Sequence, residues 1–160
     1  MIGPGLRLLF CGINPSLYSG AVGHHFARPG NRFWKALHGS GFTDRVLSPF
    51  DDALLPRFGL GITNLVERAT AGAADLSAAE IRGGAERLEA KVRRYRPATV
   101  AFLGIQAYRA AYGRRHAGIG PQEETIAGTR LWLLPNPSGA QAHYQLDALV
   151  ELFRPLREAT

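Results

Sequence analysis

The chain alternates short apolar runs with stretches of helical periodicity, and this alternation restricts its possible folds more than any other feature. The apolar runs cover residues 6–13, 60–66, 99–104 and 131–135. Each run has the length of a strand that is buried on both faces, and none is long enough for a typical buried helix. We therefore expect four buried strands with helices between them.

Helix signals occupy the intervals between these runs. Asn31 is placed to cap a short helix. Ser77 and Glu80 have the spacing of a capping box, in which each side chain bonds a free backbone N–H of the other, and Pro97 ends the helix that follows. Another short helix is expected over residues 105–112. Apolar stripes at helical spacing support the capped helices and the last one: Phe33, Trp34 and Leu37; Ile81, Ala85, Leu88, Val92 and Tyr95; Leu146, Leu149, Val150 and Phe153.

Strands that alternate with helices are typical of a mostly parallel sheet with helices on both faces. The chain has 160 residues, a common size for one domain, and no linker or low-complexity stretch divides it. We therefore predict an α/β fold, a three-layer sandwich with a central four-stranded sheet, in a single domain over residues 1–160. In such folds ligands bind outside the carboxyl ends of the strands.

The charge balance favours a polyanionic partner. Lys and Arg number 19 against 13 Asp and Glu, a net charge of +6, which favours nucleic acid through counterion release, although a solvated basic surface is the alternative. The single cysteine, Cys11, excludes an intramolecular disulfide and a Cys-based zinc cluster. We find no apolar run near the roughly 20 residues of a membrane span and no secretory signal pattern. We therefore expect a soluble, cytoplasmic protein with no membrane partner.

Two Asn-Pro-Ser segments directly follow expected strands. The first is Asn14-Pro15-Ser16, and the second begins Asn136-Pro137-Ser138 and continues into Gly139. Asn-Pro commonly initiates a turn, which explains either segment taken alone. Because the carboxyl ends of parallel strands lie at one edge of a sheet, we expect both segments to face one crevice. There the amide of each asparagine can donate and accept hydrogen bonds.

Residues 17–30 form a long segment without regular periodicity, which in a compact domain is typical of a functional loop. Phe26 in this segment is either a core residue or a platform on which a flat ring stacks. His24 and His25 are adjacent in sequence, and adjacent side chains converge poorly on one ion. We therefore expect no metal and no cofactor.

Five ordered motifs run along nearly the whole chain, from about residue 5 to about residue 155. They are Gly12-Ile13-Asn14-Pro15, Gly23-His24-His25-Phe26, Pro29-Gly30-Asn31-Arg32-Phe33-Trp34-Lys35, Gly61-Ile62-Thr63-Asn64-Leu65-Val66-Glu67-Arg68 and Asn136-Pro137-Ser138-Gly139. Together these motifs resemble the mismatch-specific uracil/thymine DNA glycosylases. The resemblance implies the uracil-DNA glycosylase fold, a central four-stranded, mostly parallel sheet flanked by helices.

The resemblance also implies hydrolysis of the N-glycosidic bond of uracil, or of a related pyrimidine, in a nucleotide flipped out of duplex DNA. Phe26 matches the aromatic that stacks on the flipped base, and Asn14 matches the residue that positions the attacking water. Backbone groups around Ile13 would read the pyrimidine edge. Ser16 stands where a glycine is often found and Asn64 where some members carry lysine, so both could tune the polarity of the pocket. The other positions assigned to substrate binding are Gly12, Pro15 and Asn31.

The chemistry of Asn14 limits such an enzyme, because an amide orients water but takes up no proton at neutral pH. Positioning, and backbone N–H groups that stabilise the departing base, must then supply most of the rate. We expect a slow enzyme that favours uracil and electron-poor pyrimidines. Asp75 is the second catalytic candidate, either as favourable charge near a helix N-terminus or as a general base that supplements or replaces Asn14. Asp51 and Asp52 are expected in a surface turn.

The second Asn-Pro motif matches the family's insertion loop, and the resemblance assigns it to DNA binding. The N–H groups of Ser138 and Gly139, expected at the start of the last helix, could hold a phosphate. A bulky apolar wedge is expected after the glycine, but Ala140 is too short to fill a vacated base position. Gln141 or Tyr144 could substitute, or the gap stays partly open. Ala142 stands where the loop often carries an arginine. The residues assigned to DNA are Asn136, Pro137, Ser138, Gly139, Ala140 and Gln141.

The resemblance thus predicts a monofunctional DNA glycosylase that initiates base excision repair. The matched motifs place no lysine where a nucleophile would stand, so strand cleavage by Schiff-base chemistry is not expected. A non-catalytic sensor of flipped bases or abasic sites is the alternative. A small nucleotide-binding enzyme is a third class, which the lack of a Gly-rich phosphate loop after the first strand disfavours. The expected partner is double-stranded DNA that contains uracil or a mismatched pyrimidine, bound by a monomer.

Overall fold

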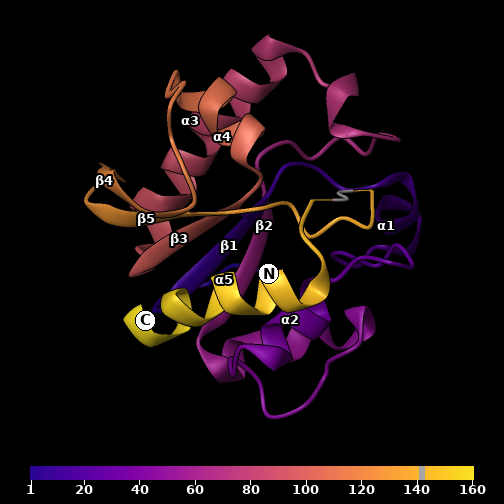
Figure 1. The fold of residues 1–160 in the computed structure, drawn as a ribbon. Coiled ribbons are helices and arrows are strands. Elements are labelled where there is room, and N and C mark those ends of the chain that lie inside the picture. Colours follow the sequence, from indigo (N-terminus) through magenta and orange to yellow (C-terminus); the bar gives the residue numbers. More distant parts are fainter. Residues whose placement is uncertain (141–142) are drawn as a thin grey trace.

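The computed structural model describes residues 1–140 and 143–160. One sheet crosses the middle of the molecule (Figure 1). Within these residues it has five strands in the order β2-β1-β3-β5-β4. The parallel strands are β1 (Leu8–Gly12), β2 (Leu60–Asn64), β3 (Thr99–Leu103) and β5 (Thr129–Leu134), and β4 (Gly120–Ile126) pairs antiparallel with β5.

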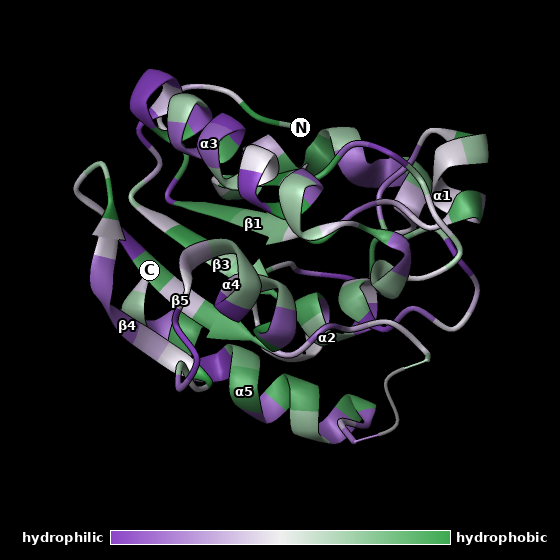
Figure 2. Cartoon of the chain, turned by 90° about the horizontal axis from the view of Figure 1, so that it is seen from above, coloured by the Kyte–Doolittle hydropathy of each residue, from purple (hydrophilic) through white to green (hydrophobic). Residues whose placement is uncertain are grey.

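The predicted α/β fold with a mostly parallel central sheet is confirmed, but the expected strand count of four was too low. The missed strand, β4, lies at the edge of the sheet. Its residues alternate between half-buried and exposed, and Ile126 at its end is buried. A strand with solvent beside it needs no continuous apolar run, so the pattern that identified the other strands does not occur there. Figure 2 shows the contrast, with β1 mostly green and β4 mostly white and purple.

Helices cover both faces of the sheet, with α3 and α4 above it and α2 and α5 below it in Figure 1. The α-helices are α1 (Leu17–Val22), α2 (Phe33–Gly39), α3 (Ala78–Tyr95), α4 (Ile105–Tyr112) and α5 (Leu146–Ala159). The 3-10 helices are η1 (Pro49–Phe58) and η2 (Ala73–Asp75). No helix in residues 1–140 and 143–160 is long and apolar enough to span a bilayer.

The two faces of the sheet bury separate cores, because successive strand residues point to opposite sides. Leu8 and Phe10 of β1 pack with buried residues of α2, α5 and η1. Leu9 and Cys11 of β1 pack with buried residues of α3 and α4. Burial on both faces explains why the parallel strands are read from the sequence as unbroken apolar runs.

The predicted helix starts are present. In α3, Oγ of Ser77 accepts from the backbone N–H of Glu80 at 3.1 Å, and the Glu80 carboxylate accepts from the backbone N–H of Ser77 at 3.2 Å. Oδ1 of Asn31 accepts from the backbone N–H of Phe33 at 2.9 Å, at the start of α2. The expected helix over residues 105–112 is α4.

The segment over residues 17–30 is not wholly irregular, because α1 occupies its beginning. Ser16 caps α1, with its Oγ accepting from the backbone N–H of Ser19 at 3.0 Å. Gly23 ends the helix in the left-handed conformation, at a φ of +73°. A helix of this length spans fewer than two turns, which is too short to give a recognisable periodicity.

A candidate active site at the carboxyl edge of the sheet

A cleft of about 560 Å³ opens where the parallel strands end. The chain passes from β1 to β2 on one side, and β3 pairs with β1 on the other side. Such a reversal of strand order leaves a crevice at the carboxyl edge of the sheet. Residues at or just beyond the end of each parallel strand line it: Ile13, Asn64, Leu103 and Asn136.

Most residues predicted for the site line this cleft. They are Gly12, Ile13, Asn14, Pro15, Ser16, Phe26, Asn31, Asn64, Asn136, Ser138, Gly139 and Ala140. The two Asn-Pro-Ser segments therefore meet at one cavity. Pro137 is buried and does not line the cleft, and neither does Asp75. Gln141 lies outside the described residues.

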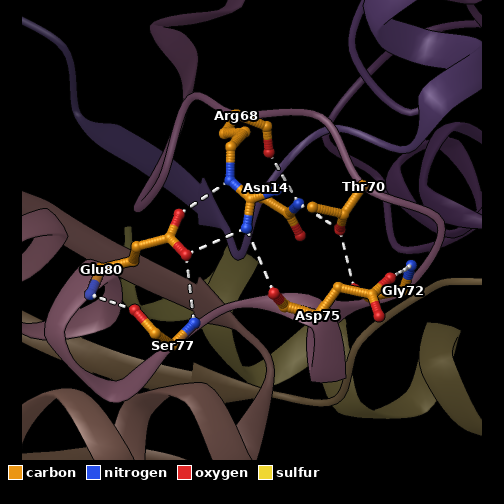
Figure 3. A network of polar contacts seen from close by, with 7 residues as sticks. All are labelled: Asn14, Arg68, Thr70, Gly72, Asp75, Ser77 and Glu80. Atoms are coloured by element: carbon orange, nitrogen blue, oxygen red, sulfur yellow. Dashed lines mark hydrogen bonds and ion pairs between the residues drawn. The ribbon is translucent and has the colours of Figure 1, made fainter.

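The side-chain amide of Asn14 is held in one orientation (Figure 3). Its Nδ2 donates to the backbone carbonyl of Arg68 at 2.9 Å and to Oγ1 of Thr70 at 2.7 Å. Because a carbonyl accepts but cannot donate, flipping the amide would lose the Arg68 contact. Oδ1 of Asn14 has no hydrogen-bond partner among residues 1–140 and 143–160. This oxygen is therefore left to accept a hydrogen bond at the cleft.

The partners of Asn14 belong to a network that continues to the start of α3 (Figure 3). The buried hydroxyl of Thr70 donates onward to the carbonyl of Gly72 at 2.7 Å. The carboxylate of Asp75 accepts from the backbone N–H of Gly72 at 3.1 Å, so Asp75 caps the short η2 turn. Asp75 is exposed and engaged in this turn rather than facing the cleft.

Arg68 ties the same segment to α3. Its guanidinium donates to both carboxylate oxygens of Glu80 at 2.9 Å and to the backbone carbonyl of Asp75 at 3.1 Å. The hydrogen bond from Arg68, followed by the backbone bond from Ser77, lowers the pKa of Glu80 to about 2. Glu80 is therefore ionised at neutral pH, and its bond with Arg68 is charge-assisted.

Phe26 lines the cleft in a strained backbone conformation. Its φ of +51° lies in the left-handed region, which residues with a side chain seldom adopt. Neighbouring peptide groups are fixed, since Nε1 of Trp34 donates to the carbonyl of His25 at 3.2 Å and Oγ of Ser19 accepts from the N–H of Ala27 at 2.9 Å. Strain that surrounding contacts maintain in a cleft residue is typical of a functional position.

Gly12 lets two cleft residues approach the end of β1. A Cβ at Gly12 would lie 2.7 Å from Oδ1 of Asn64 and 3.3 Å from ring atoms of Phe26. The Phe26 ring also packs against Phe33, with ring centroids 4.4 Å apart. The absence of one methyl group thus allows an amide and an aromatic ring to border the same space.

The loop that follows β5 is shaped by its own polar groups. Oδ1 of Asn136 accepts from the backbone N–H of Ser138 at 3.0 Å, and Oγ of Ser138 accepts from the N–H of Ala140 at 3.3 Å. The expectation for phosphate binding is corrected on two points. The N–H of Ser138 is already used within the loop, and α5 begins at Leu146 rather than beside Ser138.

The structure describes two of the residues considered for the wedge position, Ala140 and Tyr144. Ala140 is exposed, as a residue meeting DNA would be. Tyr144 is half-buried and packs against the core on the α2 and α5 side, so its ring is not presented as a wedge. Gln141 and Ala142 lie outside the described residues.

A family model described as the uracil DNA glycosylase superfamily matches residues 1–157. The chain belongs to the uracil DNA glycosylase superfamily. Members of this superfamily are DNA glycosylases, hydrolases that act on DNA. The cleft at the carboxyl edge is therefore the candidate site of a DNA glycosylase.

This glycosylase superfamily member carries a His-Asp pair that the sequence did not predict. Asp52 lies in η1 and is buried, which corrects its expected place in a surface turn. Its carboxylate lies 3.1 Å from Nδ1 of His24, and Phe50 packs edge-on against the His24 ring. The pair anchors the segment that leads to Phe26. A contact across 28 residues leaves no local sequence signal.

The cleft also includes His25, whose burial lowers the pKa of its imidazole below the ordinary value. Its imidazole is therefore neutral at pH 7. Among residues 1–140 and 143–160, no group of three or more His, Cys, Asp or Glu is arranged to hold a metal ion.

Thr70, which lines the candidate site, and Arg32, which bonds a loop that lines it, were not predicted from the sequence. Thr70 lies two residues after the fourth motif, and its hydroxyl accepts from the Asn14 amide. Arg32 lies inside the third motif, and its guanidinium bonds the loop after β5. Their position inside or near a motif could have marked both residues as functional. Their hydrogen-bond partners could not be predicted, because these lie far away in the sequence.

Proposed function

We propose that this protein is a monofunctional, mismatch-specific DNA glycosylase that hydrolyses the N-glycosidic bond of uracil flipped out of duplex DNA. Related damaged or mismatched pyrimidines are secondary substrates in this proposal. Membership of the uracil DNA glycosylase superfamily supports the reaction class. The observation that carries the proposal for this chain is the fixed amide of Asn14, with its Oδ1 left unbonded at the cleft among the described residues.

Asn14 would orient the attacking water through Oδ1. Its amide cannot take the proton, so the water attacks as a neutral molecule once the bond to the base is largely broken and the anomeric carbon of the sugar is electron-poor. The base leaves as an anion, and the proton of the added water passes to solvent. The segment after β1 is rigid, because the carbonyls of Gly12, Ile13 and Pro15 accept from the N–H groups of residues 65, 66 and 70. A rigid segment holds the water without reorganisation, which is the main source of rate in this mechanism.

Phe26 and Asn64 would hold the flipped base beside Gly12. An aromatic face stacks on any pyrimidine ring, and an amide can both donate to and accept from the pyrimidine edge. Backbone N–H groups near Ile13 would stabilise the negative charge on the departing base. Because the anion leaves without a strong acid in this mechanism, uracil and electron-poor pyrimidines should react faster than thymine.

A single-turnover panel tests the proposal, using duplexes with U:G, U:A and T:G pairs and single-stranded DNA with U. The unaltered protein should release uracil fastest from U:G. Asn14→Ala should lower the rate by at least about 10²-fold, because the water loses its acceptor. Phe26→Ala should weaken productive binding, and an unchanged rate in this variant would refute the stacking role.

The alternative of a non-catalytic sensor has a distinct outcome in the same panel. A sensor would release no base from any substrate, and Asn14→Ala would bind uracil-containing duplex as tightly as the unaltered protein. Equal rates on U:G and U:A would remove mismatch specificity from the proposal and leave a general uracil glycosylase. A strand break formed together with base release would contradict the monofunctional assignment.

A further inference from the structure

The guanidinium of Arg32 donates hydrogen bonds to backbone carbonyls in the loop that follows β5. Nε of Arg32 donates to the carbonyl of Pro137 at 3.4 Å, and Nη2 donates to the carbonyl of Ser138 at 2.6 Å. Nη1 donates to the carbonyl of Tyr144. The backbone N–H of Arg32 adds a bond to the carbonyl of Pro137 at 3.0 Å. One residue at the start of α2 therefore bonds backbone carbonyls of Pro137, Ser138 and Tyr144.

The described part of this loop, residues 136–140, has little regular structure of its own. Asn136 and Pro137 form a tight turn with Ser138, and α5 begins later, at Leu146. Loop carbonyls that lack partners cost free energy unless water or a side chain satisfies them. Arg32 supplies a rigid fork of donors that reaches several carbonyls together, which the point charge of a lysine cannot do.

The loop and the segment before α2 also contact each other through their backbones. A Cβ at Gly139 would lie 2.8 Å from the backbone carbonyl of Gly30. Gly30 stands two residues before Arg32, and both glycines line the cleft. The loop thus meets the 30–32 segment through close backbone packing as well as through the guanidinium.

We propose that Arg32 is a positioning residue that holds the 136–140 loop in the shape that engages DNA. This inference rests on the proposed function and on the expectation from the family resemblance that this loop binds the duplex. Arg32 acts through backbone carbonyls and touches neither the base nor the attacking water. Its loss therefore raises the DNA concentration needed for half-maximal rate and leaves the rate at saturating DNA within about threefold.

The experiment compares Arg32→Met, Arg32→Lys and Gly139→Ala with a matched control, Arg93→Met. Arg93 is exposed on α3, on the other face of the sheet, and its loss removes the same charge. Single-turnover rates are measured against the concentration of a U:G duplex at several salt concentrations. Arg32→Met and Gly139→Ala should raise the half-saturating concentration by at least about tenfold, and Arg93→Met should not.

Arg32→Lys separates positioning from direct phosphate contact. A phosphate contact survives in the lysine variant, and its loss in Arg32→Met lowers the salt slope of binding by about one. Positioning predicts that Arg32→Lys fails nearly as badly as Arg32→Met and that both keep the salt slope of the unaltered protein. Rescue by lysine with a reduced slope in Arg32→Met would overturn the proposal. A fall in the saturating rate alone would also overturn it.

Amide hydrogen exchange in the free protein provides a readout that needs no activity. Arg32→Met should speed exchange in residues 138–140 and leave exchange in β1 unchanged, and unchanged exchange in the loop would contradict the clamp. If no variant releases uracil, including the unaltered protein, the proposed function fails while this measurement still decides whether Arg32 holds the loop.

Discussion

At the scale of single residues, the shape of the cleft depends on the absence of a side chain at Gly12. The space that a side chain would take is occupied by the Asn64 amide and the edge of the Phe26 ring. Asn14, two residues later, is oriented by groups more than fifty positions away. The space for a base therefore depends on the small residue at position 12, and the orientation of the amide that would hold a water depends on contacts with residues distant in sequence.

Gly12→Ala should disable the site and leave the fold intact. The new Cβ would lie 2.7 Å from Oδ1 of Asn64, so the amide and the Phe26 ring must move. We expect base release to fall by about 10²-fold and the free energy of unfolding to fall by about 1–3 kcal/mol. Rates and thermal unfolding check this expectation. Gly118→Ala is the matched control, since a Cβ there meets no atom within 4 Å, and equal rates in the two variants would contradict it.

Substitution of Asp75 tests whether it acts as a base or as a turn cap. Asp75→Asn keeps an oxygen that can accept from the Gly72 N–H and removes the charge. We expect near-normal single-turnover rates in Asp75→Asn, and in Asp75→Ala a loss of about 0.5–2 kcal/mol of stability. A rate reduced by about 10²–10⁴ in both variants would instead identify Asp75 as the general base.

At the scale of elements, the start of α3 joins the helix to the segment that holds Asn14. Ser77 and Glu80 form the capping box, and Arg68 bridges Glu80 to Asp75 (Figure 3). The backbone carbonyl of Arg68 accepts from Asn14, so the end of this helix and the orientation of the amide share one residue.

The Arg68–Glu80 pair should make stability depend on acid pH. The pKa of Glu80 is lowered from 4.5 to about 2 in the folded protein, chiefly by the hydrogen bond from Arg68. The contribution is therefore fully present above about pH 5 and is lost as pH falls toward about 2. The difference in Tm between the unaltered protein and Glu80→Gln should shrink across this window. Glu123→Gln on the exposed side of β4 is the control, and a difference that stays constant with pH would refute the expectation.

At the scale of the whole molecule, net charge and the cleft act together. The chain carries a net charge of +6, and the cleft lies at the edge where the parallel strands end. Arg28 lines that cleft, so positive charge reaches the place where DNA is proposed to bind. A basic protein that binds a polyanion releases counterions when it does so.

DNA affinity should therefore fall steeply with salt. Between about 50 and 200 mM salt we expect at least about a tenfold loss of affinity for a uracil-containing duplex, measured by fluorescence anisotropy. The same titration with a neutral-backbone duplex is the control and should be nearly flat. A flat response with ordinary DNA would contradict binding driven by phosphates.

Much of this architecture could be predicted because burial leaves a periodic trace. Strands covered on both faces must be apolar, and α3 shows its covered stripe and its capping box in the sequence. Parallel strands place their carboxyl ends together, so the sequence predicts that Asn14 and Asn136 face one crevice. The edge strand β4 was not predicted because its exposure to solvent removes the continuous apolar run. The helix α1 was not predicted because it is too short to show a periodic pattern.

The sequence by itself determined the α/β layers, the order of the main elements and the edge at which the two Asn-Pro-Ser segments meet. The tertiary structure alone decided which amide atom of Asn14 stays unbonded, that Asp52 holds His24, and that Arg32 grips the loop after β5. Periodicity records what each residue buries along its own element. Contacts between side chains and distant backbone depend on how the elements pack, and no local pattern encodes them.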